Sequence, residues 1–126
     1  MKVRKIYWVM TVLIMAMTTG CYYDVITPPD PNAPPQNVSF SNDLQPIFNS
    51  NCATSGCHGT GGHNPILTAD VSYNSLMSGG FVNTIIPTES ILYTELNNGL
   101  MPPTGKLPQV QIQQVLDWIK IGAPNN

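Results

Sequence analysis

The stretch Cys52-Ala-Thr-Ser-Gly-Cys57-His58 decides how the rest of the chain is interpreted. It contains two thiols with four residues between them, and an imidazole follows the second thiol directly. A pair of nearby cysteines is a weak signal by itself, because many exported proteins use such a pair to close a small disulfide. The meaning of this stretch therefore depends on the histidine and on the segments around it.

Two thiols followed by a histidine form a variant of the motif that attaches haem covalently. In that chemistry the two thiols add to the two vinyl groups of the haem, and the histidine is the proximal ligand of the iron. The usual motif has two residues between the cysteines, so the additional residues here must loop out while both sulfurs reach their vinyl groups. Cys52 and Cys57 are the candidate attachment residues, and His58 is the candidate iron ligand.

Three flanking segments accompany this motif. Residues 40–48 precede it, residues 99–103 follow it with the sequence Gly-Leu-Met-Pro-Pro, and residues 111–120 form an apolar and polar pattern near the end. In that order the segments resemble the monohaem cytochrome c family, most closely the c-like domains of bacterial envelope proteins. The resemblance covers about residues 39–124. It implies a small all-α fold, in which short helices and long loops surround one covalent haem c.

Apolar spacing predicts a helix at each end of this region. Leu44, Ile47 and Phe48 share one face of a short helix, which Ser41 or Asn42 can cap. Near the end, four residues follow the i, i+3, i+4, i+7 spacing of an amphipathic helix: Ile112, Val115, Leu116 and Ile119. The resemblance implies that these two apolar faces pack against each other.

Two shorter helices are expected between these two. They cover residues 71–77 and 90–96, and Thr88 is the predicted cap of the second. No stretch alternates between apolar and polar residues for long enough to predict a strand. The predicted fold class is therefore all-α.

Met101 is the candidate for the second axial ligand, because the resemblance places the distal methionine of the family in the segment 99–103. Histidine and methionine together favour a comparatively high reduction potential. Met77 is a rival, but it falls inside a predicted helix, where a methionine more often packs in the core. His63 follows His58 by five residues, which is too short a connection to reach the opposite face of a haem.

Pro65 resembles the proline whose carbonyl accepts a hydrogen bond from the proximal histidine in this family. Such a bond fixes the orientation of the imidazole and raises its basicity. An ordinary loop proline is the alternative. Trp118 and Tyr93 either line the haem pocket or belong to the core.

Residues 1–20 have the pattern of an export signal, with a basic start and an apolar run at 6–17 that is too short for a stable membrane anchor. The small residue before Cys21 resembles the lipobox of bacterial lipoproteins, which implies that Cys21 carries a lipid. Ordinary cleavage and an uncleaved anchor are the alternatives. Tyr22 follows Cys21 where an aspartate commonly retains lipoproteins at the inner membrane, so the outer membrane is preferred.

Residues 21–38 are predicted to be a tether. They contain five prolines among polar residues and no periodic apolar pattern. In polyproline geometry the seventeen residues 22–38 reach at most about 50 Å. The remaining domain, residues 39–126, has a length at which an apolar core is marginal without a metal, disulfides or a cofactor.

Removal of the signal leaves an acidic chain, because only Lys106 and Lys120 remain against seven acidic residues, a net charge of −5. This composition excludes a basic surface for nucleic acid. It favours redox protein partners with a basic docking face. The mature chain contains no arginine and no pattern of nucleophile and base, so an electron carrier is predicted rather than a catalyst.

The predicted function is a monohaem c-type cytochrome that transfers single electrons on the periplasmic side of a bacterial cell envelope. A disulfide-closed interaction module is one alternative. A zinc-binding module is another, with four ligands: Cys52, Cys57, His58 and His63. A haem enzyme with an open distal face and the electron-input subunit of a larger oxidoreductase also remain open.

Overall fold

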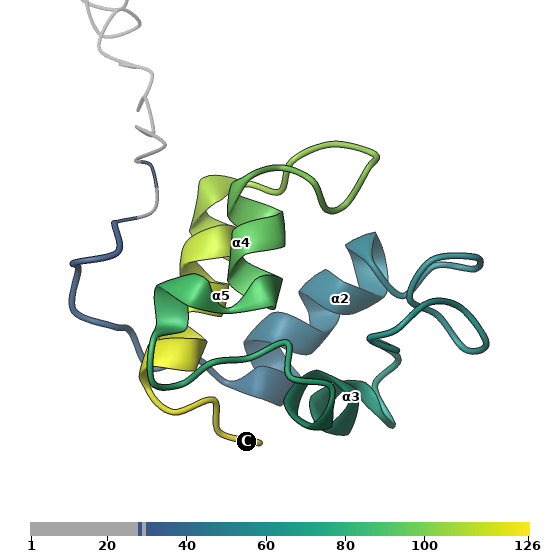
Figure 1. Ribbon diagram of the computed structural model, residues 1–126, viewed down its shortest axis with the longest axis horizontal. Coiled ribbons are helices and arrows are strands. Elements are labelled where there is room, and N and C mark those ends of the chain that lie inside the picture. Colours follow the sequence, from purple (N-terminus) through teal and green to yellow (C-terminus); the bar gives the residue numbers. More distant parts are fainter. Residues whose placement is uncertain (1–27, 29) are drawn as a thin grey trace, which may run out of the picture.

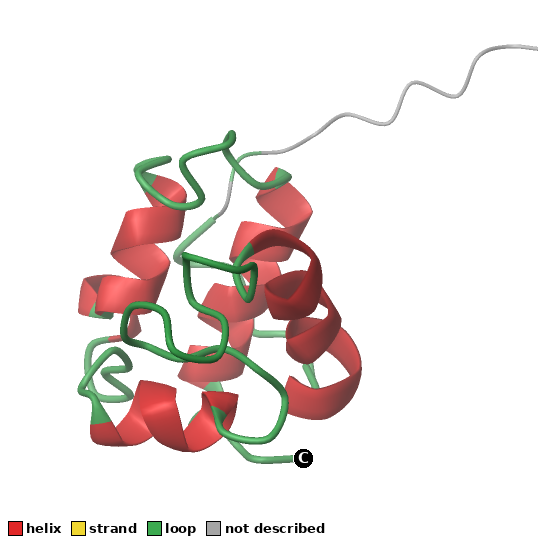
Figure 2. Ribbon diagram, turned by 90° about the vertical axis from the view of Figure 1, so that its right-hand side faces the viewer, coloured by secondary structure: helices red, strands yellow, loops and turns green. Residues whose placement is uncertain are grey.

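The computed structural model describes residue 28 and residues 30–126, and this part of the chain contains helices and loops but no strand (Figure 1). Figure 2 shows the loops, which occupy much of one side. The elements are the π-helical turn η1 (Phe40–Leu44), α2 (Gln45–Asn51), α3 (Ser72–Ser78), the 3-10 turn η2 (Pro87–Glu89), α4 (Ile91–Asn97) and α5 (Gln109–Lys120). The predicted all-α class is confirmed.

The first turn, η1, is capped by Ser39 and not by the predicted Ser41 or Asn42. The Asn42 N–H donates to Ser39 Oγ (3.2 Å), and the Ser39 N–H donates to the Asp43 carboxylate (2.8 Å). The side chains of Ser39 and Asp43 thus each accept a hydrogen bond from a backbone N–H at the start of η1. The cap lies earlier than predicted because Phe40 already belongs to the buried face.

The predicted packing of the N-terminal residues against the C-terminal helix is made through η1, which contacts α5. All seven apolar residues expected to meet belong to one buried core: Leu44, Ile47, Phe48, Ile112, Val115, Leu116 and Ile119. Between them the Phe40 ring lies 5.2 Å from the Trp118 ring and 5.3 Å from the Tyr73 ring, measured between centroids. Trp118 is fully buried and donates its indole N–H to the Pro124 carbonyl (2.9 Å). Among the described residues, Trp118 therefore belongs to the apolar core.

The two middle helices each begin one residue later than predicted. Met77 lies in α3 and packs against the core, as expected for a helical methionine. Thr88 does not cap α4, because Pro87 starts the separate turn η2 and Thr88 lies within it. Ser90 is the cap residue of α4, and its hydroxyl bonds to the backbone of Asn83 instead of to the helix.

Residue Asn126 joins the end of the chain to η1. Its backbone oxygen accepts hydrogen bonds from the Ser41 N–H (2.8 Å) and from the hydroxyls of Ser39 (3.0 Å) and Ser41 (2.7 Å). Its side-chain oxygen accepts the Phe40 N–H (2.8 Å). These bonds satisfy the first donors of η1 from a residue more than 80 positions away in the sequence.

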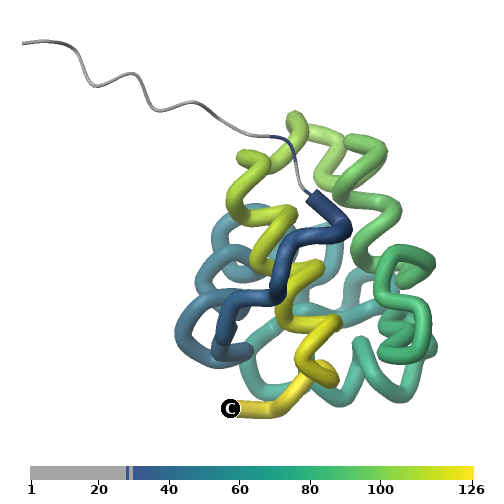
Figure 3. The backbone as a smooth tube through the Cα atoms, turned by 90° about the vertical axis from the view of Figure 1, so that its left-hand side faces the viewer, coloured from purple at the N-terminus to yellow at the C-terminus, as the bar shows by residue number. Residues whose placement is uncertain are grey.

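The last part of the predicted tether lies along α5 (Figure 3). The Asp30 N–H donates to Gln113 Oε1 and the Lys120 ammonium donates to the Ala33 carbonyl, both at 2.9 Å, while Val38 is only 2% exposed. The boundary predicted at residue 39 thus falls within a packed segment. The predicted signal and Cys21 lie outside the described residues, in which no helix has both the length and the apolar character to cross a membrane.

Candidate functional site

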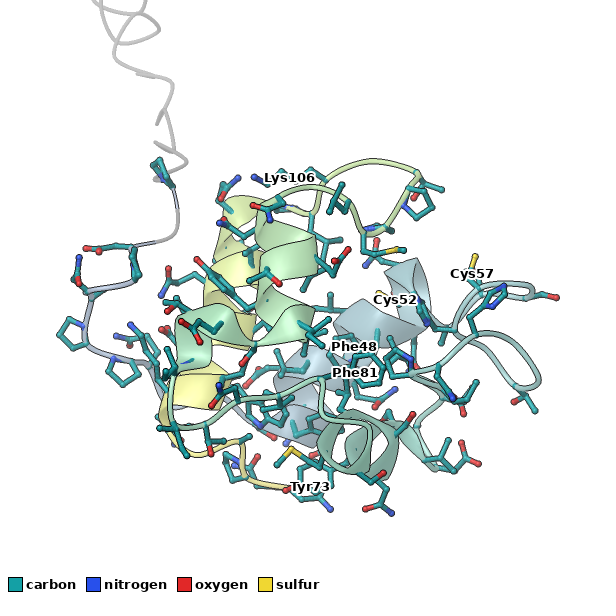
Figure 4. All side chains as sticks on the ribbon, in the orientation of Figure 1. Phe48, Cys52, Cys57, Tyr73, Phe81 and Lys106 are labelled. Carbon is teal, nitrogen blue, oxygen red and sulfur yellow. The ribbon has the colours of Figure 1, made fainter. Side chains whose placement is uncertain are left out.

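The stretch from Cys52 to His58 closes on itself at the end of α2. The Cys52 N–H donates to the Phe48 carbonyl (2.9 Å), which continues the hydrogen bonding of the helix. The Cys52 carbonyl then accepts the His58 N–H (3.1 Å), so the two ends of the stretch are joined. Figure 4 shows Cys52 beside the end of α2 and Cys57 in the loop beyond it. We call residues 52–67 the His58 loop.

The residues between the two cysteines form a turn that projects from the domain. The Cys57 N–H donates to the Thr54 carbonyl (3.1 Å), and Gly56 has φ = +79°. A residue without Cβ adopts this conformation at little cost, which suits the third position of such a turn. Thr54 and Ser55 are exposed. The additional residues therefore loop out, as the spacing predicted.

The two thiols differ in their surroundings. Cys52 is only 8% exposed, whereas Cys57 is half-buried, and neither forms a disulfide. Burial, followed by the nearby Cys57 thiolate, raises the pKa of Cys52 to about 11. At neutral pH the loop therefore holds Cys52 as a protonated thiol beside a more accessible one.

The imidazole of His58 is held by two backbone carbonyls. Its Nδ1 lies 2.9 Å from the Pro65 oxygen and 3.1 Å from the His63 oxygen. Because a carbonyl oxygen only accepts hydrogen bonds, these contacts place the proton on Nδ1. The lone pair of Nε2 is then free to bind a metal, and the Nδ1 bond fixes the ring. The expected hydrogen bond between His58 and Pro65 is present.

Close backbone approaches shape the rest of the His58 loop. The His63 N–H donates to the Cys57 carbonyl and the Leu67 N–H donates to the His58 carbonyl, both at 2.7 Å. A Cβ placed on Gly62 would overlap the Cys57 carbonyl oxygen, and one on Gly59 would lie 2.9 Å from the Thr54 oxygen. Sequence reasoning treated these glycines only as a short connection, although their density in residues 59–62 was the available signal.

A buried amide connects the His58 loop to the helices. Gln45 on α2 donates its Nε2–H to the Leu67 carbonyl (3.0 Å) and accepts a hydrogen bond from the Ser72 hydroxyl of α3. Gln45 and Ser72 are both buried. Neither residue was singled out from the sequence, because a glutamine within an apolar helical pattern carries no distinctive local signal.

Met101 lies in a second loop, residues 98–108, which joins α4 to α5 and which we call the Met101 loop. Its side chain is 39% exposed and that of Leu100 is 59% exposed. The N–H groups of both residues donate to the Glu95 carbonyl (3.2 and 3.0 Å). Figure 1 shows the Met101 loop and the His58 loop projecting from the same side of the helices, and Figure 2 faces that side.

Four candidate haem-binding residues thus lie in the His58 loop, namely Cys52, Cys57, His58 and Pro65, and Met101 lies in the other loop. No protein-family model, curated protein sequence or solved structure matches this chain. Among the described residues, no three His, Cys, Asp or Glu side chains come together as a metal site, so the four-ligand zinc arrangement has no counterpart there.

The other candidates have different surroundings. His63 is exposed in the His58 loop and contributes its carbonyl, not its ring, to the contact with His58. Tyr93 is buried in the core, and this burial raises the pKa of its phenol. Seven large apolar residues are exposed in the described part of the chain, and two of them, Leu100 and Met101, lie in the Met101 loop, where a bound apolar group would cover them.

Proposed function

We propose that this protein is a monohaem c-type cytochrome that transfers single electrons in a bacterial cell envelope. The observation that supports this most strongly is the His58 imidazole, whose Nδ1–H points to the Pro65 carbonyl at 2.9 Å. This leaves Nε2 as a metal-binding nitrogen on a ring whose orientation is fixed. The imidazole directly follows a pair of free thiols, which is the donor set that covalent haem attachment requires.

The residues of both loops fit the proposed cofactor. Cys52 and Cys57 would each add their S–H across one vinyl group, so that no leaving group is released. His58 would bind the iron through Nε2, and Met101 through its thioether. When bound, haem supplies a one-electron couple between ferrous and ferric iron. Leu100 and Met101 would lose exposed apolar surface, which favours binding.

We also infer that the helices adopt a cytochrome c-like arrangement. The support is the contact between the first and last elements, where Phe40 of η1 lies 5.2 Å from Trp118 of α5. Both rings are buried in a core that the His58 loop joins through Gln45. This packing would hold one side of the proposed haem site rigidly.

The surroundings of the proposed cytochrome follow from charge and from the N-terminal sequence. With a net charge of −5 after removal of the signal, it would dock on basic faces of redox partners and associate more slowly as salt concentration rises. A lipid on Cys21 would hold it at the periplasmic side of a membrane, for which we propose the outer membrane. It would act as a carrier and not as a catalyst.

The first test is the intact mass of the mature protein under denaturing conditions, after production in a host that attaches c-type haem. We expect an added haem mass that survives denaturation, because thioether bonds are covalent. The double variant Cys52→Ala/Cys57→Ala is the control and should show the mass of the bare chain. A wild-type chain that is lighter by two hydrogen atoms, with Cys52 joined to Cys57, would overturn the proposal and support a disulfide-closed module.

The second test concerns Met101. In the reduced Met101→Ala variant, carbon monoxide should bind rapidly, since the distal position is open, whereas the wild type should bind it poorly. Met77→Ala is the matched control, because that methionine packs in the core and should leave binding unchanged. Equal binding by the wild type and Met101→Ala would remove Met101 from its proposed role.

A further inference from the structure

We infer that Ser75 is a positioning residue for His58, and that its hydroxyl controls how strongly the Pro65 carbonyl binds the imidazole. The inference rests on the proposed function, in which His58 binds iron. Ser75 lies on α3, outside the His58 loop and 17 positions from His58 in the sequence. Nothing in its sequence neighbourhood indicates such a role.

The two residues are connected through a single peptide unit. The Ile66 N–H donates to Ser75 Oγ at 2.8 Å, and the Pro65 carbonyl accepts from His58 Nδ1 at 2.9 Å. The carbonyl of Pro65 and the N–H of Ile66 belong to the same amide. A continuous chain of hydrogen bonds therefore runs from the His58 ring through that amide to the Ser75 hydroxyl.

This arrangement has a direct electronic consequence. An amide whose N–H is hydrogen-bonded is polarised, and its oxygen becomes a better acceptor, by roughly 10–30% per bond. A better acceptor draws the Nδ1 proton more strongly, so that more electron density is offered by Nε2 to a metal. A more electron-rich imidazole stabilises the oxidised iron, so the Ser75 hydroxyl should lower the reduction potential.

The Pro65 acceptor, through Ser75, is also better anchored than the second acceptor of His58. The Ser75 N–H donates to the Val71 carbonyl (2.9 Å), and the adjacent Leu76 is fully buried. The second acceptor of Nδ1 is the carbonyl of His63, a residue whose side chain is exposed. The bond to Pro65 is thus fixed by a helix of the core, whereas the bond to His63 depends on the loop alone.

The test uses the full mature chain, produced with haem, in the variant Ser75→Ala. We expect hydrogen exchange of the Ile66 amide to become about tenfold faster, since its partner is lost. The ¹⁵N resonance of His58 Nδ1 should shift, and the reduction potential should rise. The variant Ser75→Thr keeps a hydroxyl and should restore all three readouts. Ser78→Ala is the matched control on the same helix, because the Ser78 hydroxyl bonds only to the Asn74 carbonyl.

A faster Ile66 exchange with an unchanged Nδ1 resonance and potential would overturn the inference and leave Ser75 as a structural residue. Unchanged Ile66 exchange would also overturn it, because the bond would not exist. If the alanine variant does not fold, Ser75→Cys replaces it, because a cysteine sulfur is a weaker acceptor than a hydroxyl. This variant should change the Nδ1 resonance and the reduction potential by an intermediate amount. If the chain carries no haem, the proposed function fails, whereas the Ile66 and Nδ1 readouts in the bare chain still decide the role of Ser75.

Discussion

The His58 loop and the Met101 loop, which carry the two proposed axial ligands, are held in different ways. In the His58 loop, the carbonyls of Cys52, Cys57 and His58 each accept a backbone N–H from within the loop, and Gln45 ties its end to α2. In the Met101 loop, Leu100 and Met101 share one acceptor, the Glu95 carbonyl, and both residues are exposed. In Figure 4, the label Cys57 marks the His58 loop and the label Lys106 marks the Met101 loop.

This difference indicates how readily each of the two proposed ligands would bind the iron. An imidazole that is already oriented loses little conformational entropy when it binds a metal, whereas an exposed loop must be ordered at that moment. Segments with exposed backbone hydrogen bonds and few buried contacts also open more readily. We therefore expect His58 to be a preformed ligand and the Met101 loop to be the adaptable part of the site.

The largest effect is expected from Gly62→Ala in the His58 loop. A Cβ at this position overlaps the Cys57 carbonyl, and a backbone atom cannot move aside as a side chain can. We expect a loss of about 3 kcal/mol in the free energy of unfolding, measured by urea titration. Gly105→Ala in the Met101 loop is the control: its φ of +143° is unfavourable, but the space is open, so the loss should be about 1 kcal/mol. Equal losses would contradict the comparison.

The second effect concerns thiol reactivity in the haem-free chain. The thiolate is the reactive form, so raising the pKa of Cys52 from 9.0 to about 11 should slow its alkylation about 100-fold at pH 8 relative to the urea-unfolded chain. Peptide mass spectrometry with iodoacetamide measures this rate, and Cys57 serves as the more accessible internal control. Equal rates in the folded and unfolded chains would show that the His58 loop forms only with a cofactor.

The same pKa shift has a consequence for stability. Folding raises the pKa of Cys52, so the native chain binds its proton more tightly than the unfolded chain does. The stability of the haem-free chain should therefore fall as the pH rises from 9 to about 11. Cys52→Ala should remove the part of this pH dependence that begins near pH 9, whereas the part due to Tyr93, whose pKa burial also raises, should remain.

A smaller effect is expected from Gln45→Ala, which removes the connection between the His58 loop and the core. The Leu67 carbonyl and the Ser72 hydroxyl would lose their partner, at a cost of about 2 kcal/mol in the free energy of unfolding. Asn49→Ala is the control, because Asn49 is exposed and only accepts from Gln45. Hydrogen exchange should become faster at Leu67 and remain unchanged at Leu100, and an equal increase at both would contradict the separation of the two loops.

The smallest effect is expected from Thr104→Ala in the Met101 loop. Thr104 is exposed, and substitutions of this kind change stability by less than about 0.5 kcal/mol. For a domain of this size, the melting temperature should then change by at most about 4 °C. A single hydrogen bond contributes about 1 kcal/mol to stability. A decrease in the free energy of unfolding larger than this would show that the Met101 loop is as tightly held as the His58 loop.

Much of the helical structure could be predicted from the sequence. The spacing of Ile112 to Ile119 identifies the buried face of α5. The turn residues around the two middle helices predict the bounds of these helices to within one residue. These features depend on neighbours three or four residues apart, which are visible in the sequence. The cap of η1 was missed because its position depends on the burial of Phe40 and on Asn126 at the other end of the chain.

By itself, the sequence determined where the helices form and that two thiols precede an imidazole, because both are local patterns. Only the tertiary structure decided which groups hold that imidazole: the Pro65 amide with Ser75 behind it, and Gln45 at the end of the loop. A hydrogen bond forms only where the donor–acceptor distance is correct to within a few tenths of an ångström and the donor points at the acceptor. For residues on separate elements, that orientation is set by the packing of the helices and not by their positions in the sequence.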